Sequence, residues 1–147
     1  MIEKLAGRSD LWPTEGMWRN LGGRVVSAEP GRVVMEAELS VEAHGFPTRN
    51  GPIVHGGALA AFADCALASA AATLASAGEV PTTSSLSVDF YRPGRPGRLV
   101  ARAEARHRTS RLAYCHCAIE QDDGTVVAEG RAVIYFVKVE AAGENPG

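Results

Sequence analysis

The first half of the chain carries the hydrophobic pattern of a β-hairpin. Hydrophobic residues recur at every second position from Val33 to Val41, with mostly charged or polar residues between them. This period of two predicts a half-buried strand. Residues 24–28 predict a partner strand, and Glu29, Pro30 and Gly31 supply the turn between the two.

The same period returns in the second half of the chain. Alternating hydrophobic and polar positions predict four more strands, at residues 85–90, 99–108, 112–120 and 126–136. Proline, glycine and aspartate cluster between them at residues 93–97 and 121–124, as turns require. Four consecutive strands with such short connections favour an antiparallel sheet.

One helix separates the two groups of strands. Residues 44–54 hold two prolines and two glycines without periodicity, which indicates a loop. Eleven of the twenty residues at 58–77 are alanine, and none is glycine or proline, so one long helix is predicted, ending at Gly78. Alanine side chains let such a helix lie closely against a sheet. The fold class is therefore α+β.

Composition limits the class of protein and the class of partner. The 147 residues suit one domain, here assigned to residues 21–139, with an N-terminal extension and short helix at 1–20 and a flexible tail at 140–147. A formal charge of -2 argues against nucleic acid as the partner and favours a small molecule. The three cysteines form no disulfide framework and the N-terminus lacks an apolar signal segment, which favours the cytoplasm.

The alanine-rich segment is long enough to resemble a membrane span, since about 20 residues are needed. Asp64 alone would cost roughly 2.5 to 3.5 kcal/mol at a bilayer centre. We therefore expect no membrane insertion.

Asp64 is the most informative residue of this segment. It is the only charged residue from Gly56 to Gly78. An ionised carboxylate removed from water costs several kcal/mol, so its presence in an apolar helix suggests a function. At the predicted helix start, the N–H groups of Gly56 and Gly57 have no intrahelical partner and could hold a carbonyl oxygen that becomes an oxyanion. Asp64 would then act as general base or nucleophile in hydrolysis of an activated acyl group.

Helix geometry separates these groups within one chain. Asp64 follows Gly57 by seven residues, or about 700°, so both lie within roughly 20° of one face, but about 10 Å apart along the axis. One reacting carbon cannot touch both. Two chains with antiparallel helices would bring Asp64 of one near the Gly56 turn of the other, so a dimer with two shared sites is predicted. In the alternative interpretation, Asp64 merely caps or hydrogen-bonds a neighbouring loop and the glycines serve packing.

Two sequence blocks resemble a known family. The first is Gly51-Pro-Ile-Val-His-Gly-Gly-Ala-Leu59, with Asp64 nine positions after His55; the second is Thr83-Ser-Ser-Leu-Ser-Val-Asp-Phe-Tyr-Arg-Pro93. Together with the element order, over residues 20–137, they resemble the hotdog-fold thioesterases of the 4-hydroxybenzoyl-CoA thioesterase superfamily, in particular the PaaI-like branch.

The resemblance implies a fold, an activity and residue roles. The family fold is a long helix wrapped by an antiparallel sheet, and its members hydrolyse acyl-CoA thioesters as dimers or dimers of dimers, without metal or cofactor beyond the coenzyme A of the substrate. It implies that Gly56 supplies the oxyanion N–H, that Asp64 of the partner subunit is base or nucleophile, that His55 shapes the turn and that Thr83 orients the attacking water.

One position departs from the family. Many relatives carry an asparagine six positions before this histidine, where the present chain has Arg49; Asn50 lies five before. Either the loop is one residue shorter and Asn50 takes over that role, or the role is absent.

Other polar residues have weaker patterns. Cys115 and Cys117 flank His116, which a strand would turn to the opposite face, so strand core is favoured over a metal site. His44 and His107 are interpreted as ordinary surface or loop residues. Four arginines could contact coenzyme A phosphates, and Arg111, at a strand turn, is the preferred one; a solvated strand face explains the other three, Arg102, Arg106 and Arg108, equally well.

Two other functions stay open on the sequence. Hydratases and dehydratases that act on acyl thioesters share the hotdog fold, and a non-catalytic acyl-CoA binding protein is possible because a fold does not fix a function. Asp64 after the His-Gly-Gly turn favours hydrolysis.

Overall fold

The computed structural model of the protein describes residues 12–139. Most of the predicted N-terminal extension, residues 1–11, and the predicted tail, residues 140–147, lie outside this range; the division into extension, domain and tail stays a prediction. The described elements are, in order, α2 (Met17–Asn20), β1 (Arg24–Glu29), β2 (Arg32–Leu39), α3 (Val41–His44), β3 (Gly45–Phe46), β4 (Ile53–Val54), α4 (Gly56–Ala72), β5 (Glu79–Phe90), β6 (Gly97–Arg108), β7 (Leu112–Gln121) and β8 (Val126–Lys138).

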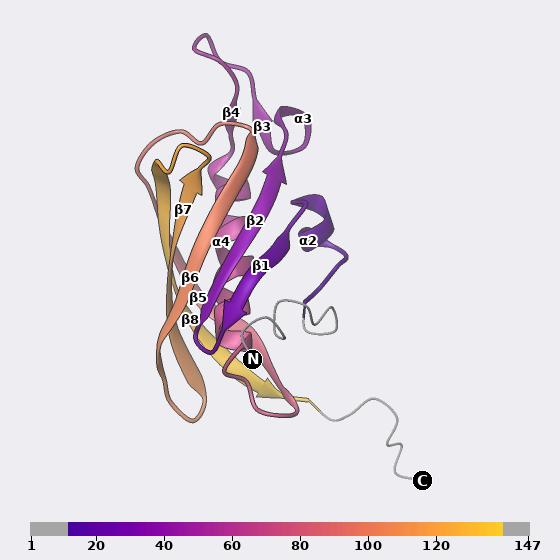
Figure 1. Ribbon diagram of the computed structural model, residues 1–147, viewed down its shortest axis with the longest axis vertical. Coiled ribbons are helices and arrows are strands. Elements are labelled where there is room, and N and C mark those ends of the chain that lie inside the picture. Colours follow the sequence, from indigo (N-terminus) through magenta and orange to yellow (C-terminus); the bar gives the residue numbers. More distant parts are fainter. Residues whose placement is uncertain (1–11, 140–147) are drawn as a thin grey trace.

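Six strands form one antiparallel sheet in the order β1-β2-β6-β7-β8-β5, and β3 and β4 form a separate pair (Figure 1). The β1–β2 hairpin and the four later strands confirm the predicted pattern. Because β5 joins the sheet beside β8, the chain crosses from β2, next to one edge of the sheet, to the opposite edge through α4. That connection places the helix across the sheet.

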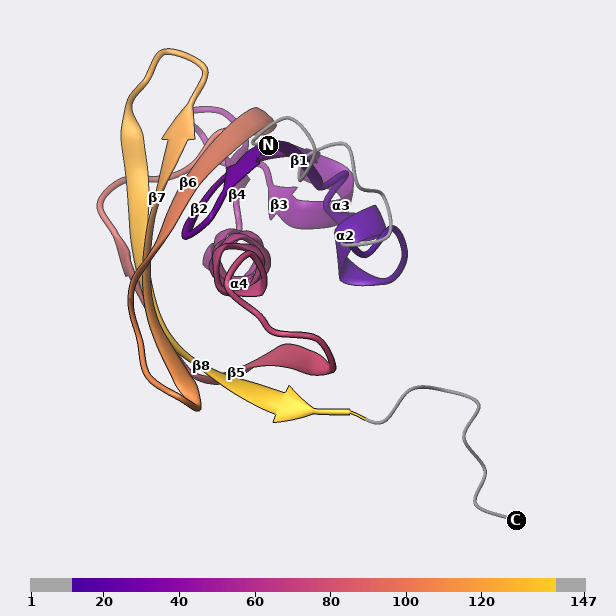
Figure 2. The same cartoon turned by 60° about the horizontal axis from the view of Figure 1, so that its bottom comes forward.

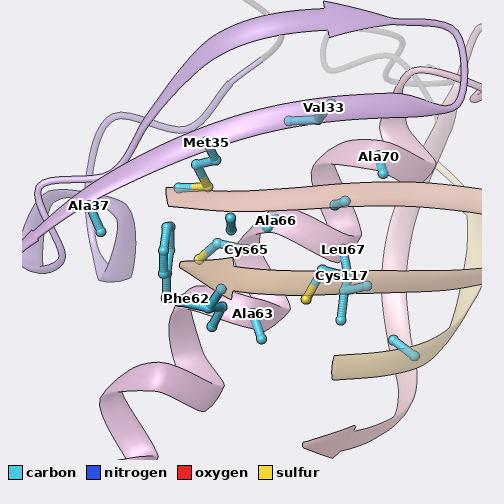
Figure 3. Close-up of a cluster of buried hydrophobic side chains, with 14 of the residues drawn as sticks. Val33, Met35, Ala37, Phe62, Ala63, Cys65, Ala66, Leu67, Ala70 and Cys117 are labelled. Atoms are coloured by element: carbon cyan, nitrogen blue, oxygen red, sulfur yellow. The ribbon is translucent and has the colours of Figure 1, made fainter. Parts of the chain in front are cut away.

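The sheet curves around α4, which Figure 2 shows nearly end-on. Phe62, Ala63, Ala66 and Leu67 of α4 are fully buried against the concave face. Figure 3 shows this layer, in which Met35 and Cys117 come from the sheet. Side chains that alternate along the strands thus meet a helix whose alanines allow close approach. This is the hotdog fold that the sequence predicted.

The helix ends at Ala72, six residues before the predicted end at Gly78. Thr73 explains the difference. Its Oγ1 donates a hydrogen bond to the Ala70 carbonyl oxygen at 2.7 Å and accepts one from the Gly31 N–H at 2.7 Å. This ties the helix end to the β1–β2 turn, and the chain then leaves in short turns despite its high helix propensity. Tertiary contacts therefore outweigh propensity here.

A second difference concerns the residues after β2. Val41, predicted in the strand, instead begins α3, because Ser40 caps that helix by accepting a hydrogen bond from the Ala43 N–H at 3.1 Å. His44 ends α3 and is buried, with 6% of its surface exposed. The interpretation of His44 as an ordinary surface or loop residue was wrong.

Glu36 is buried although it occupies a polar position of the strand pattern. It lies on β2 between Arg24 of β1 and Arg98 of β6, and both guanidinium groups donate hydrogen bonds to its carboxylate. The hydrogen bonds from Arg98, and then those from Arg24, hold the pKa of Glu36 below its usual value although burial acts in the opposite direction. Three strands are thus joined by one carboxylate.

The strand β5 forms an open edge of the sheet. It pairs with β8 on one side, and among residues 12–139 no strand pairs with its other side. The residues of this strand are exposed or half-buried throughout. Such an edge is a template for pairing with another chain.

No helix of the described part is long and apolar enough to cross a membrane.

Candidate active site

Asp64 lies in the middle of α4, half-buried, and faces β5. Thr83 Oγ1 donates a hydrogen bond to Asp64 Oδ1 at 2.6 Å. Thr83 sits opposite the buried Ile134 of β8, so its side chain points to the concave face, and the register of β5 shifts directly after it. Such an irregularity often re-aims a side chain next to an active site.

Among the described residues, Asp64 forms no ion pair. Its carboxylate therefore keeps acceptor positions for a water or a substrate. In the alternative interpretation of the sequence, Asp64 caps or hydrogen-bonds a neighbouring loop. In the structure its hydrogen bond is with Thr83, which belongs to strand β5. Asp64 and Thr83 were both predicted as site residues, and although they lie nineteen positions apart in the chain, they are in contact in the structure.

The helix start presents free donors. His55 is the N-cap residue, and its carbonyl oxygen accepts from the N–H groups of Ala58 at 3.0 Å and Leu59 at 3.2 Å. Within residues 12–139, the N–H groups of Gly56 and Gly57 have no hydrogen-bond partner. A Cβ on Gly57 would meet nothing within 4 Å, whereas one on Gly56 would lie 3.3 Å from the Phe90 ring. A ligand oxygen can therefore approach these donors, with Phe90 as one wall.

His55 holds this turn through its backbone. Its N–H donates to the His44 carbonyl oxygen at 2.8 Å, and its exposed ring lies against Phe46 with the ring centres 4.7 Å apart. His44, which the sequence pattern did not mark as buried, supports this turn through its backbone and its ring. Its Nδ1 accepts from the Ser40 N–H at 3.0 Å, so in the neutral ring Nε2 carries the proton and donates to the Asn20 carbonyl oxygen at 2.9 Å. In the sequence, only Ser40, a helix-capping residue four positions before His44, could have indicated that His44 ends a short helix.

Gly56 and Asp64 are separated within one chain. Both belong to α4, eight residues apart, which corresponds to about 12 Å of rise along the axis. Oxyanion donors and a base must both lie about 3 Å from the reacting groups. One carbonyl group therefore cannot contact both the Gly56 N–H and the Asp64 carboxylate of the same chain.

Asn50 lies in an exposed turn beyond β3, where its N–H donates to Thr48 Oγ1 at 3.2 Å. It lines a groove of about 860 Å³ together with Ile53, Arg92 and Arg95. Arg92 was noted in the sequence only as part of the resemblance. It forms no ion pair with the described residues, while Arg95 reaches Asp123 at 3.5 Å. This groove thus lies beside the segment that leads into the His-Gly-Gly turn, and it is cationic.

Arg111 occupies the turn between β6 and β7, at the end of the sheet where α4 finishes (Figure 1). Its neighbour Arg108 donates hydrogen bonds to the Leu74 carbonyl oxygen and to Glu79. Arg108 is therefore part of a structural ion pair rather than a solvated strand face. Within one chain, Arg111 and the helix start lie at opposite ends of α4.

The cysteine next to Asp64 is not a nucleophile at neutral pH. Burial, and then the negative charge of Asp64, raise the pKa of the Cys65 thiol to about 11. A neutral thiol is a poor nucleophile.

Cys115 and Cys117 are buried strand residues, and His116 turns to the other face of β7, as predicted. Residues 12–139 contain no group of three side chains suited to a metal ion.

Comparisons with known proteins give the family and the fold. The family model described as "Thioesterase superfamily" matches residues 51–128. A solved thioesterase-superfamily protein of Bordetella bronchiseptica is 30% identical, with a TM-score of 0.76, over 92% of this chain and 97% of its own. PaaI from the phenylacetic acid degradation operon of E. coli is 24% identical, with a TM-score of 0.72, over 86% of both chains. A search of curated proteins gives no match.

Proposed function

Because the chain belongs to the thioesterase superfamily, we propose that it hydrolyses acyl-CoA thioesters to a free acid and coenzyme A. The observation that carries the proposal is the Thr83–Asp64 hydrogen bond of 2.6 Å on a helix that begins with two free N–H groups. A carboxylate without a cation and an oxyanion site are the two parts that acyl transfer to water needs.

The proposed step uses these parts in order. The N–H groups of Gly56 and Gly57 hold the thioester carbonyl oxygen as negative charge develops on it. Asp64 accepts a proton from water as the water oxygen attacks the carbonyl carbon; alternatively it attacks that carbon itself and forms a mixed anhydride, which water hydrolyses to the free acid and the Asp64 carboxylate after the thiolate has left. The C–S bond then breaks, and the thiolate of coenzyme A leaves and takes up a proton. Thr83 holds one carboxylate oxygen of Asp64 so that the other faces the substrate.

We further propose that the site is shared in a homodimer. Antiparallel pairing of two β5 edges about a two-fold axis brings the Phe90 end of one strand toward the Glu79 end of the other. Phe90 lies against Gly56, so the helix start of one subunit approaches the Asp64 side of its partner. Assembly into a dimer of dimers stays a prediction.

The cationic groove suits the coenzyme A half of the substrate. Arg92 and Arg95 lie beside the segment that precedes Gly56, and guanidinium groups bind phosphate oxygens well. We therefore propose Arg92 as the first phosphate contact, before Arg111, with Asn50 on the same groove wall. Arg111 contributes only if the partner subunit brings it to the groove.

Thiol release from a panel of acyl-CoA thioesters tests the function. Asp64→Asn removes the base, and we expect a loss of about 10²- to 10⁴-fold in kcat. Glu38→Gln is the matched control, an exposed carboxylate on β2, far from β5 in the strand order, whose removal leaves turnover unchanged. Unreduced hydrolysis by Asp64→Asn removes Asp64 from the mechanism. Binding without turnover of any thioester supports a binding protein, and hydration of an enoyl-CoA supports a hydratase.

A further inference from the structure

A second groove lies on the outward face of α4. It has a volume of about 550 Å³ and is walled by Trp12 and Trp18, with Ala68 and Ala72 of the helix as its floor. The two indole rings are stacked, with centres 6.5 Å apart and planes inclined by 22°. We call it the tryptophan groove. Its size falls in the range of about 300 to 1,000 Å³ that is usual for small-molecule sites.

Asp64 is not itself a lining residue of this groove but lies one helical turn before its alanine floor. Ala68 follows Asp64 by four residues and so lies on the same face, one turn further along the helix. Cys65, the next residue after Asp64, also lines the groove, and its thiol is neutral. A group that extends from the carboxylate toward the C-terminal end of α4 therefore passes directly over an apolar floor.

The opposite rim of the groove is the start of β5, at Glu79, Val80 and Pro81. Glu79 brings a charge to this rim, but Arg108 Nη2 lies 2.8 Å from its carboxylate and compensates that charge. Antiparallel pairing of β5 would bring the Phe90 end of the partner strand, and with it the partner's Gly56 turn, to this same rim. The groove thus opens where the shared site would form.

We propose that the tryptophan groove binds the acyl group of the substrate and selects bulky apolar acyl groups over short ones. This proposal rests on the proposed function and names the substrate class of the same site. The thioester carbonyl carbon lies between Asp64 and the partner's Gly56 turn, so the acyl group must leave it on one side and coenzyme A on the other. The cationic groove suits phosphates, and the aromatic groove with alanine floor suits hydrocarbon.

Intrinsic fluorescence tests this assignment without turnover. The chain has two tryptophans, and both line the groove, so their emission reports its occupancy. The probes are thioether analogues of phenylacetyl-CoA and of octanoyl-CoA, which cannot be hydrolysed, and coenzyme A alone. Calorimetry measures the binding of each. We expect both acyl analogues to change the emission at saturation and coenzyme A alone to leave it unchanged. Bound analogues that leave the emission unchanged overturn the proposal, as does an equal change with coenzyme A.

Filling the groove gives a second test. Ala68→Leu places a branched side chain on its floor, and the ratio of kcat/KM for octanoyl-CoA to that for acetyl-CoA should fall about tenfold or more. Trp12→Ala should also change this ratio. The control is Tyr114→Ala, which removes a half-exposed aromatic residue from β7. An equal loss on both substrates contradicts an acyl groove but leaves thioester hydrolysis standing, whereas a wild type that hydrolyses neither overturns the proposed function. If a side chain of the partner subunit filled the groove, Ala68→Leu would leave the octanoyl-CoA to acetyl-CoA ratio of kcat/KM unchanged, and that result would also contradict the proposal.

Discussion

Two carboxylates, Glu36 on β2 and Asp64 on α4, have opposite surroundings. Glu36 receives hydrogen bonds from two guanidinium groups, while Asp64 receives one from the Thr83 hydroxyl and has no cationic partner among the described residues. Arginine saturates the acceptor positions of Glu36 and compensates its charge. Asp64 keeps both its charge and free acceptor positions.

This difference separates a residue used for stability from one available for chemistry. A carboxylate that joins three strands contributes to folding, and its oxygens are occupied. A half-buried carboxylate on an open helix face contributes little to folding but can accept a proton. Burial alone does not make this distinction, because Glu36 is the more buried of the two.

After Asp64→Asn, the largest expected effect comes from removing an oxyanion donor at the start of α4. Gly56→Pro removes the oxyanion N–H at the first helical position, where proline is tolerated, and the N-cap ψ of 138° at His55 suits a following proline. We expect kcat to fall about 10²- to 10³-fold with little loss of stability. Steady-state kinetics and thermal unfolding measure the two.

Gly56→Ala is the matched control. It keeps the N–H and adds a similar Cβ contact with the Phe90 ring. An activity as low as that of the proline variant would assign the loss to crowding and not to the missing donor.

Thr83→Val sharpens the role of the hydroxyl. The valine side chain has the same shape, but it leaves one oxygen of Asp64 without its donor. We expect a decrease of about tenfold in kcat, equivalent to about 1.4 kcal/mol, with little change in KM. Thr83→Ser should restore the rate, since it retains the hydroxyl. A change in KM alone would instead indicate that Thr83 contacts the substrate.

Glu36→Gln is the counterpart in the sheet. It removes the charge that faces Arg24 and Arg98, and we expect a loss of about 1 kcal/mol in the free energy of unfolding. The value is small because the side chains of Arg24 and Arg98 are 71% and 46% exposed to solvent. Activity per folded molecule should stay that of the wild type. Urea unfolding measures the stability, and thiol release measures the activity. A loss of activity per folded molecule without a loss of stability would contradict the structural role of Glu36.

The pH dependence of that loss follows from the lowered pKa of Glu36. The unfolded chain takes up a proton at the usual value of 4.5, before the folded chain does. The stabilisation is therefore complete at neutral pH and is lost as the pH falls below 4.5 through the folded pKa. The stability difference between wild type and Glu36→Gln should shrink in that range, and a difference that grows there would contradict the assignment.

The sequence predicted the fold because local pattern and tertiary structure agree in the strands and in the centre of α4. It missed the end of the helix, since Thr73 is held by Gly31, a contact that propensity cannot reveal. Asp64 became a candidate from its charge alone and Thr83 from resemblance, and both roles stay predictions. The burial of His44 and the pairing of Glu36 depend on elements distant in sequence, as do both grooves, so no local pattern encodes them.

Subunit complementation tests the central claim most directly. A purified heterodimer with one Asp64→Asn chain and one Gly56→Pro chain has, if sites are shared, one intact site and one with both defects. We predict about half of the wild-type kcat per dimer, against the residual activity of either homodimeric variant. If each chain forms its own site, both sites carry one defect, and a heterodimer no more active than the two homodimers would contradict the account.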